Sequence, residues 1–210
     1  MIDPEFAIVG AMLPVVGGFH YASDTLKGIT RPNRMSWLLW TIAPAIAFVA
    51  ELAQHTPIEI AALTLAFSFA SLLVVLASFL NPHAYWKITR FDIACGLLAL
   101  LAVLLWATTG QGNIAIVCAI LIDFLASLPT IGKLYSHSET ERGVVYLACV
   151  AGSLITLATI KSWTFANFAI PLYYLLIDSI LLGVMLFPSR NRAFPVMSAD
   201  NNPPQDNSSK

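Results

Sequence analysis

The chain has 210 residues, of which 58% are apolar and only 11% are charged, and its formal net charge is -1. Soluble domains carry roughly 25% charged residues, so this composition predicts a polytopic membrane protein. The near-zero net charge, without a basic patch of interleaved aromatic residues, argues against nucleic-acid binding.

Seven apolar segments follow one another, each close to the roughly 20 helical residues that a bilayer core requires. Asp3 and Glu5 precede the first segment without any Lys or Arg, which is the opposite of a signal-peptide n-region. We therefore expect an all-α integral membrane protein with seven transmembrane helices. The expected spans are Phe6–Leu26, Ser36–Ala53, Pro57–Leu80, Phe91–Thr108, Asn113–Leu134, Gly143–Ile160 and Thr164–Phe187.

The connections alternate between tight turns and longer polar loops. Of the Lys and Arg residues, only Lys161 lies on the side of the tight turns, and the others lie in the longer loops or after Pro188. Because cytoplasmic loops carry the excess of positive charge, this predicts an N-terminus outside and a C-terminus in the cytoplasm. The tail at 189–210 is rich in Asn, Pro and Ser, and we expect it to be disordered.

The two halves of the chain repeat weakly with an offset of 106 residues. Lys133 then aligns with Lys27 and Tyr146 with Trp40, and the apolar segments of the two halves coincide. Four spans separate the starts of the two repeats, so both share one orientation, as in the parallel repeats of some secondary transporters. We expect a first three-helix bundle at 1–80, an inner loop and linker helix at 81–112, a second three-helix bundle at 113–188, and the cytoplasmic tail.

The inner end of the fifth span carries Pro129, Thr130 and Lys133. A proline inside a spanning helix frees a backbone carbonyl and bends the axis, which makes Pro129 a candidate hinge. The three-one-three plan, with a Lys four residues after the proline of a Pro-Thr pair, resembles the PQ-loop superfamily, which includes the SWEET sugar transporters. The resemblance implies alternating access between the two bundles. In the first repeat, Ser23 and Asp24 occupy the Pro-Thr position.

The resemblance does not fix the solute. In SWEET transporters an Asn near the middle of spans three and seven helps to bind substrate. Here Asn167 lies nearer the outer end of span seven, and span three has no Asn before Asn81. The expected solute is therefore a small polar metabolite: a sugar, a vitamin or a similar molecule.

Three ionisable residues, His20, Asp123 and Asp178, are expected in the middle third of the bilayer. Such groups are costly in lipid and mark a pathway, a relay or a contact inside the bundle. They belong to spans one, five and seven, so they could converge on a central cavity. There an acid would bind a cation or a proton, and His20 would relay protons or contact substrate. The alternative is that each carboxyl is structural and is hydrogen-bonded to a neighbouring helix.

Span seven adds polar groups through Asn167, Tyr173 and Tyr174, which could contact a small polar ligand. Packing against lipid also explains the two tyrosines. At the membrane boundaries, Trp37 and Trp40 are expected to act as interfacial anchors.

The inner ends of the helices hold the candidate gate residues. Asp24 lies one turn after His20 and is expected either to orient that imidazole or to pair with Lys27 and Arg31. The candidate gate residues at this side are Asp24, Lys27 and Lys133. Each belongs to a segment that joins a candidate hinge helix to the next helix. On the outer side, Glu51 and Glu59 are expected to be solvated helix termini.

No enzyme or metal motif is present in the sequence. It lacks HExxH, GxSxG and a glycine-rich phosphate loop, and its histidines are scattered. Cys95, Cys118 and Cys149 lie in different segments without a paired spacing, which is typical of buried packing residues. We therefore expect a protein that is not an enzyme and has neither a cofactor nor a metal site.

Two functions remain at the level of the sequence. The first is a secondary transporter or facilitator that moves a small polar metabolite by alternating access. The alternative is a seven-helix membrane sensor or scaffold whose cytoplasmic loops bind a partner. The expected surroundings are the lipid bilayer of a bacterial inner membrane and the solute, and a homo-oligomer is compatible with the sequence.

Overall fold

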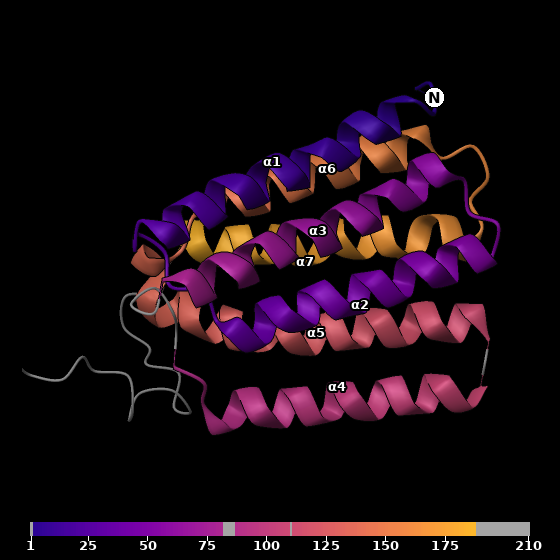
Figure 1. Cartoon of the computed structure of the whole chain (residues 1–210). Helices are drawn as coiled ribbons and strands as arrows, with labels where there is room; N and C mark the ends of the chain where they lie inside the picture. Colours follow the sequence, from indigo (N-terminus) through magenta and orange to yellow (C-terminus); the bar gives the residue numbers. More distant parts are fainter. Residues whose placement is uncertain (1, 82–86, 110, 188–210) are drawn as a thin grey trace, which may run out of the picture.

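The computed structural model describes residues 2–81, 87–109 and 111–187, and the regular structure in these ranges is entirely helical (Figure 1). The helices follow the apolar segments of the sequence. Their bounds are α1 Phe6–Leu26, α2 Arg34–Ala53, α3 Ile58–Leu80, α4 Arg90–Thr109, α5 Gly112–His137, the 3-10 helix η1 Ser138–Thr140, α6 Gly143–Thr159 and α7 Phe165–Leu186.

The helix ends agree with the expected spans to within three residues. In the described part of the chain, α1, α2, α3, α5 and α7 are long and apolar enough to cross a membrane, and α6 is a shorter apolar helix. The chain is therefore an all-helical integral membrane protein. The expected disorder of the tail at 189–210 concerns residues outside the described ranges.

The helices form two layers. Figure 1 shows α1, α3 and α2 side by side in front of α6, α7 and α5, with α4 outside α5. At the edges of the two layers, α1 packs on α6 and α2 packs on α5. Successive helices run in opposite directions, so α1, α3, α5 and α7 all end at the same side. We call this side the Lys133 end and the opposite side the Glu51 end.

Small residues allow α1 to approach both of its neighbours closely, as is common between helices in membranes. A Cβ atom on Gly10 would lie 2.8 Å from the carbonyl oxygen of Gly152 in α6. A Cβ on Gly18 would lie 2.7 Å from the Cβ of Ala70 in α3. These contacts pack α1 closely against α3 in its own layer and against α6 in the other layer.

Asn33 fixes the start of α2 at the Lys133 end. Its Oδ1 accepts hydrogen bonds from the backbone N–H groups of Met35, at 3.0 Å, and Ser36, at 3.3 Å, as expected for an N-cap. Its Nδ2 donates to Asp92 in the first turn of α4. The start of α4 is thereby tied to the beginning of α2.

Candidate functional site

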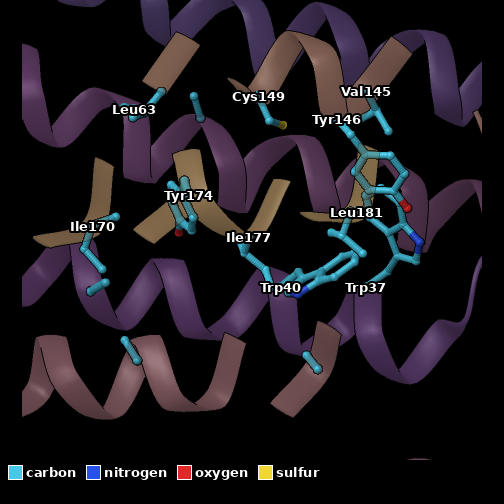
Figure 2. Close-up of a cluster of buried hydrophobic side chains, with 14 of the residues drawn as sticks. Trp37, Trp40, Leu63, Val145, Tyr146, Cys149, Ile170, Tyr174, Ile177 and Leu181 are labelled. Carbon is cyan, nitrogen blue, oxygen red and sulfur yellow. The ribbon is translucent and has the colours of Figure 1, made fainter. Parts of the chain in front are cut away.

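A buried cavity of about 40 Å³ lies between the two layers, which is room for about three water molecules. Trp37 and Trp40 of α2 and Phe67 of α3 line it from one layer, and Asp123 of α5 and Asp178 of α7 line it from the other. Figure 2 shows the two indoles with the aromatic and aliphatic side chains packed around them. The first layer thus contributes an aromatic wall, and the second layer contributes both acids together with Tyr146 and Tyr174.

Asp123 is held in place by neighbours on three helices. Its Oδ2 accepts a 2.8 Å hydrogen bond from the hydroxyl of Tyr173 in α7. Its backbone oxygen accepts from the Trp40 indole at 3.3 Å and from the Ser127 hydroxyl at 2.9 Å. The carboxyl group, which is almost fully buried, is therefore oriented, and the Tyr173 hydroxyl is its one hydrogen-bond donor among the described residues.

Asp178 is buried as deeply as Asp123 but has no such support. It is 5% exposed, and within the described ranges no group donates a hydrogen bond to its Oδ2. A buried carboxylate without a donor or a counter-charge is unfavourable, so this group requires a proton or a cation when the cavity is closed. Oδ2 of Asp178 and Nε1 of Trp37 thus both line the cavity without a hydrogen-bond partner in the described part of the chain, and Asp178 is the one that can carry charge.

An aromatic contact separates the cavity from the Glu51 end. The rings of Phe67 and Tyr174 are stacked, with centroids 3.8 Å apart and an interplanar angle of 9°. Phe67 belongs to α3 and Tyr174 to α7, so the contact joins the two layers at their centre.

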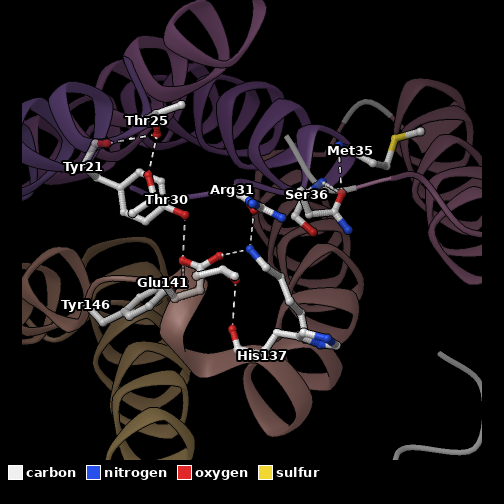
Figure 3. A network of polar contacts seen from close by, with 12 residues as sticks. Tyr21, Thr25, Thr30, Arg31, Met35, Ser36, His137, Glu141 and Tyr146 are labelled. Atoms are coloured by element: carbon white, nitrogen blue, oxygen red, sulfur yellow. Dashed lines mark hydrogen bonds and ion pairs between the residues drawn. The ribbon is translucent and has the colours of Figure 1, made fainter. Parts of the chain in front are cut away.

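A network of polar contacts closes the Lys133 end (Figure 3). Lys133 is fully buried, and its Nζ lies 2.6 Å from Oε1 of Glu141. The same ammonium group donates to the backbone oxygen of Arg31 in the connection between α1 and α2. The lysine thereby joins the end of α5 to the first layer.

Glu141 extends this network toward the cavity. Its Oε2 accepts hydrogen bonds from the hydroxyls of Tyr21 in α1, at 2.7 Å, and Tyr146 in α6, at 3.2 Å. Tyr146 also lines the cavity, and the ring of Tyr21 packs on Trp37 with centroids 4.7 Å apart. We call Tyr21, Lys133, Glu141 and Tyr146 the polar gate.

Two further contacts cross the layers beside the polar gate. The backbone N–H of Arg31 donates to the backbone oxygen of Thr140 at 3.1 Å. Asp24 of α1 pairs with Arg142, its Oδ2 lying 3.2 Å from Nε of the arginine. Asp24 was expected either to orient the imidazole of His20 or to pair with Lys27 and Arg31. The structure places His20 Nε2 3.7 Å from its Oδ2 and gives it Arg142 of the second layer as its basic partner.

The structure brings some of the predicted site residues together and leaves others apart. Asp123, Tyr173, Tyr174 and Asp178 gather at the cavity or directly beside it. The side chain of His20 is 55% exposed on the surface of α1, where it lies 3.7 Å from Asp24. The structure therefore does not place His20 in the cavity.

Asn167 and Lys27 also lie away from the cavity. Asn167 is buried, and its Nδ2 donates to the backbone oxygen of Ser162 at 2.8 Å, which holds the connection before α7. Lys27 is exposed and follows the last turn of α1. Both geometries are those of residues that stabilise helix ends.

Pro129 and Thr130 lie inside α5, which runs without interruption to His137. The Thr130 hydroxyl is buried and has no hydrogen-bond partner in the described part of the chain. An unpaired hydroxyl one turn before Lys133 leaves this stretch less tightly bonded than the polar gate that it precedes.

Sequence reasoning misassigned Trp37, Trp40 and Glu51. The two indoles are not interfacial anchors, because they are 3% and 8% exposed and line the cavity. Glu51 is not solvated, because it is fully buried and neither carboxyl oxygen has a hydrogen-bond partner among the described residues. Burial at these positions depends on which helix faces pack together, which the apolar pattern does not reveal.

Glu141 was missed as a member of the site. It was not among the candidate residues of the sequence, whereas the structure gives it the central position in the polar gate. Its proximity to Lys133, eight residues earlier, was the available signal.

Chemically, the arrangement can hold a proton or a cation at the buried acids and can close one end of the cavity through the polar gate. In the described residues, no group of three or more His, Cys, Asp or Glu side chains is placed to hold a metal ion. Comparison with known proteins finds no matching family model, no matching curated protein and no matching solved structure.

Proposed function

We propose that this protein is a small secondary transporter that moves a small polar solute by alternating access. In this proposal, α1–α3 and α5–α7 are two parallel three-helix bundles, and α4 is the linker between them. The membrane orientation follows the positive charges, so the Lys133 end faces the cytoplasm. The observation that carries the proposal is the cavity between the bundles, where Oδ2 of Asp178 is buried without a hydrogen-bond donor among the described residues.

The packing of the helices supports two equivalent bundles. If α1, α2 and α3 correspond to α5, α6 and α7, the contact of α1 with α6 corresponds to that of α5 with α2. The contacts of α3 with α1 and α2 likewise correspond to those of α7 with α5 and α6. Such an arrangement around a central site is the plan of transporters with parallel repeats.

The two ends of the cavity are closed by different means, which supports alternating access. The polar gate joins the bundles at the cytoplasmic end through charged and hydroxyl groups. The stacked rings of Phe67 and Tyr174 close the other side. A rocking motion that separates one contact while the other persists would expose the acids to one side at a time.

The proposal includes a distant relationship between this chain and the PQ-loop superfamily. Pro129, Thr130 and Lys133 carry that resemblance, and Lys133 is a member of the polar gate. A hinge at Pro129 would move the end of α5, and with it the ammonium group that contacts the first bundle.

The test is solute flux in proteoliposomes. Purified wild type, Asp178→Asn and Glu59→Gln are reconstituted and screened for uptake of labelled sugars, amino acids, nucleosides, vitamins and organic amines. Glu59 lies in the first turn of α3 and does not line the cavity, so it is a matched acid control. We expect flux of one solute class in wild type and in Glu59→Gln, and at least a tenfold loss in Asp178→Asn.

Two outcomes would contradict the proposal. Flux that is unchanged in Asp178→Asn would remove the acid from the pathway. Absence of flux for every solute, together with recovery of a partner protein bound to the loops at the Lys133 end, would favour the sensor or scaffold.

A further inference from the structure

We propose that the solute is a small organic cation, held between the carboxyl groups of Asp123 and Asp178 and the aromatic faces on the opposite wall. This inference rests on the proposed transport function and names the solute class of the same site. It predicts an amine, a quaternary ammonium or a guanidinium compound. A neutral sugar would not fit the charge of the cavity.

The first argument is charge. Two acids line the cavity, and no Lys, Arg or His lines it in the described ranges. The Tyr173 hydroxyl partly satisfies Asp123, whereas Oδ2 of Asp178 has no donor among the described residues. Two carboxyl groups without a positive partner in a membrane interior form a site that is completed by positive charge.

The second argument is the aromatic wall. Trp37 and Trp40 present indoles to the cavity from α2, and Phe67 and Tyr174 form a stacked pair beside it. A cation within about 6 Å of an aromatic face is attracted by the ring quadrupole, most strongly by Trp. Acid on one side and aromatic rings on the other bind a cation that carries carbon around its charge.

The third argument separates an organic cation from a metal ion. Hard cations require several oxygen ligands around them. Apart from its two carboxyl groups the cavity offers only hydroxyls in the described ranges, of which that of Ser127 is already bonded to the backbone of its own helix, and most of the lining is carbon. An ammonium or guanidinium group needs fewer oxygen contacts and tolerates an apolar surrounding.

The same geometry couples the solute to protons. When the cavity is closed without solute, a proton on Asp178 removes its uncompensated charge. When the cation binds, the O–H bond breaks and the proton leaves to water, so that the carboxylate pairs with the cation. The other titratable groups that line the cavity are Asp123 of α5, Tyr146 and Cys149 of α6 and Tyr174 of α7, and α2 and α3 contribute none.

The cavity of the closed form is smaller than most amines, because it holds about three water molecules. The solute therefore enters after Phe67 and Tyr174 separate or after the polar gate opens. Because Asp178 holds either the proton or the cation, one cation would then be exchanged for one proton.

The experiment compares two ligands of the same shape. Choline carries a quaternary nitrogen, and 3,3-dimethylbutan-1-ol replaces that nitrogen with carbon. Thermal unfolding of the purified protein in detergent is measured with each ligand, with guanidinium chloride at low concentration, and with sodium and lithium chloride at matched ionic strength. Ligands that bind the native state raise the midpoint by mass action.

We expect the organic cations to raise the unfolding midpoint and the neutral isostere and metal ions to leave it unchanged. The apparent affinity for the cation should increase with pH, since the proton competes with it. Asp178→Asn and Trp40→Leu should each weaken binding at least about tenfold, which corresponds to 1.4 kcal/mol. Trp40→Leu retains every charge, so it tests the aromatic wall separately from the acids.

Flux measurements separate the two proposals. Equal stabilisation by choline and its isostere, or Asp178-dependent flux of neutral solutes alone, overturns the cationic solute and keeps the transporter. Binding of cations without any flux keeps the cation site and overturns the transporter. A response to sodium or lithium alone overturns the organic cation in favour of a metal ion.

Discussion

Tyr21 and Glu141 are 120 residues apart in the sequence and share a 2.7 Å hydrogen bond in the protein interior. The tyrosine comes from α1 and the glutamate from the segment between η1 and α6, so the bond joins the two layers. Because the ring of Tyr21 also packs on Trp37, it links the closed end of the molecule to the wall of the cavity.

Removing the Tyr21 hydroxyl should loosen the Lys133 end. Cys149 lines the cavity and is buried, which makes it a natural reporter of access. In a background with Cys95 and Cys118 changed to serine, Tyr21→Phe should raise the rate at which a polar maleimide labels Cys149. The loss of one hydrogen bond to a charged group, about 1.5 to 3 kcal/mol, corresponds to about a tenfold faster rate or more.

The matched control for that measurement is Tyr173→Phe. It also removes one tyrosine hydroxyl, but from a hydrogen bond to Asp123 outside the polar gate. Labelling from the Lys133 end should stay at the wild-type rate. Equal acceleration in both variants would show that the tyrosine hydroxyls stabilise the bundle generally.

The helices were predictable from the sequence because the length of an apolar segment that crosses a bilayer is set by the bilayer, and they end within three residues of the expected positions. The similar depth of Asp123 and Asp178 was predictable from their positions in the apolar segments, but depth alone did not show that both acids line one cavity. The direction in which the His20 side chain points was not predictable either, because depth gives no information about which face of α1 packs on α3 and α6. For the same reason, Trp37 and Trp40 could be interpreted as surface anchors.

The ion pair of Lys133 and Glu141 should show strong coupling in a double-mutant cycle. Both side chains are almost completely buried, so Lys133→Met leaves an uncompensated carboxylate and should lower the free energy of unfolding by about 3 to 5 kcal/mol. Lys133→Met with Glu141→Gln should recover much of that loss. Unfolding in detergent measures the cycle, and additive effects of the two changes would contradict the buried pair.

Glu51 should tolerate a neutral amide. It is fully buried without a hydrogen-bond partner, and the Thr56 and Thr64 hydroxyls are also unpaired in the described part of the chain. Glu51→Gln keeps the shape and supplies N–H donors for hydroxyl acceptors, so the protein should be at least as stable as wild type. Glu51→Ala should be less stable, because it leaves a cavity.

The outcome that would contradict this prediction is a large loss of stability in Glu51→Gln. That result would mean that the negative charge itself is needed, and that a cation accompanies Glu51 in the folded protein. Glu59→Gln is the control, since Glu59 lies in the first turn of α3 and is partly exposed.

Close packing of α1 on α3 gives a prediction with an internal control. A Cβ on Gly18 would lie 2.7 Å from the Cβ and 2.9 Å from the Cα of Ala70, so a backbone atom would have to move. Gly18→Ala should therefore lower the free energy of unfolding by about 1 to 3 kcal/mol, the usual cost of overpacking. Gly183 in α7 has no atom within 4 Å of such a Cβ, and Gly183→Ala should raise stability by about 0.5 to 1 kcal/mol through helix propensity. If the two variants shifted the unfolding midpoint in the same direction, the close contact between α1 and α3 would not be a determinant of stability.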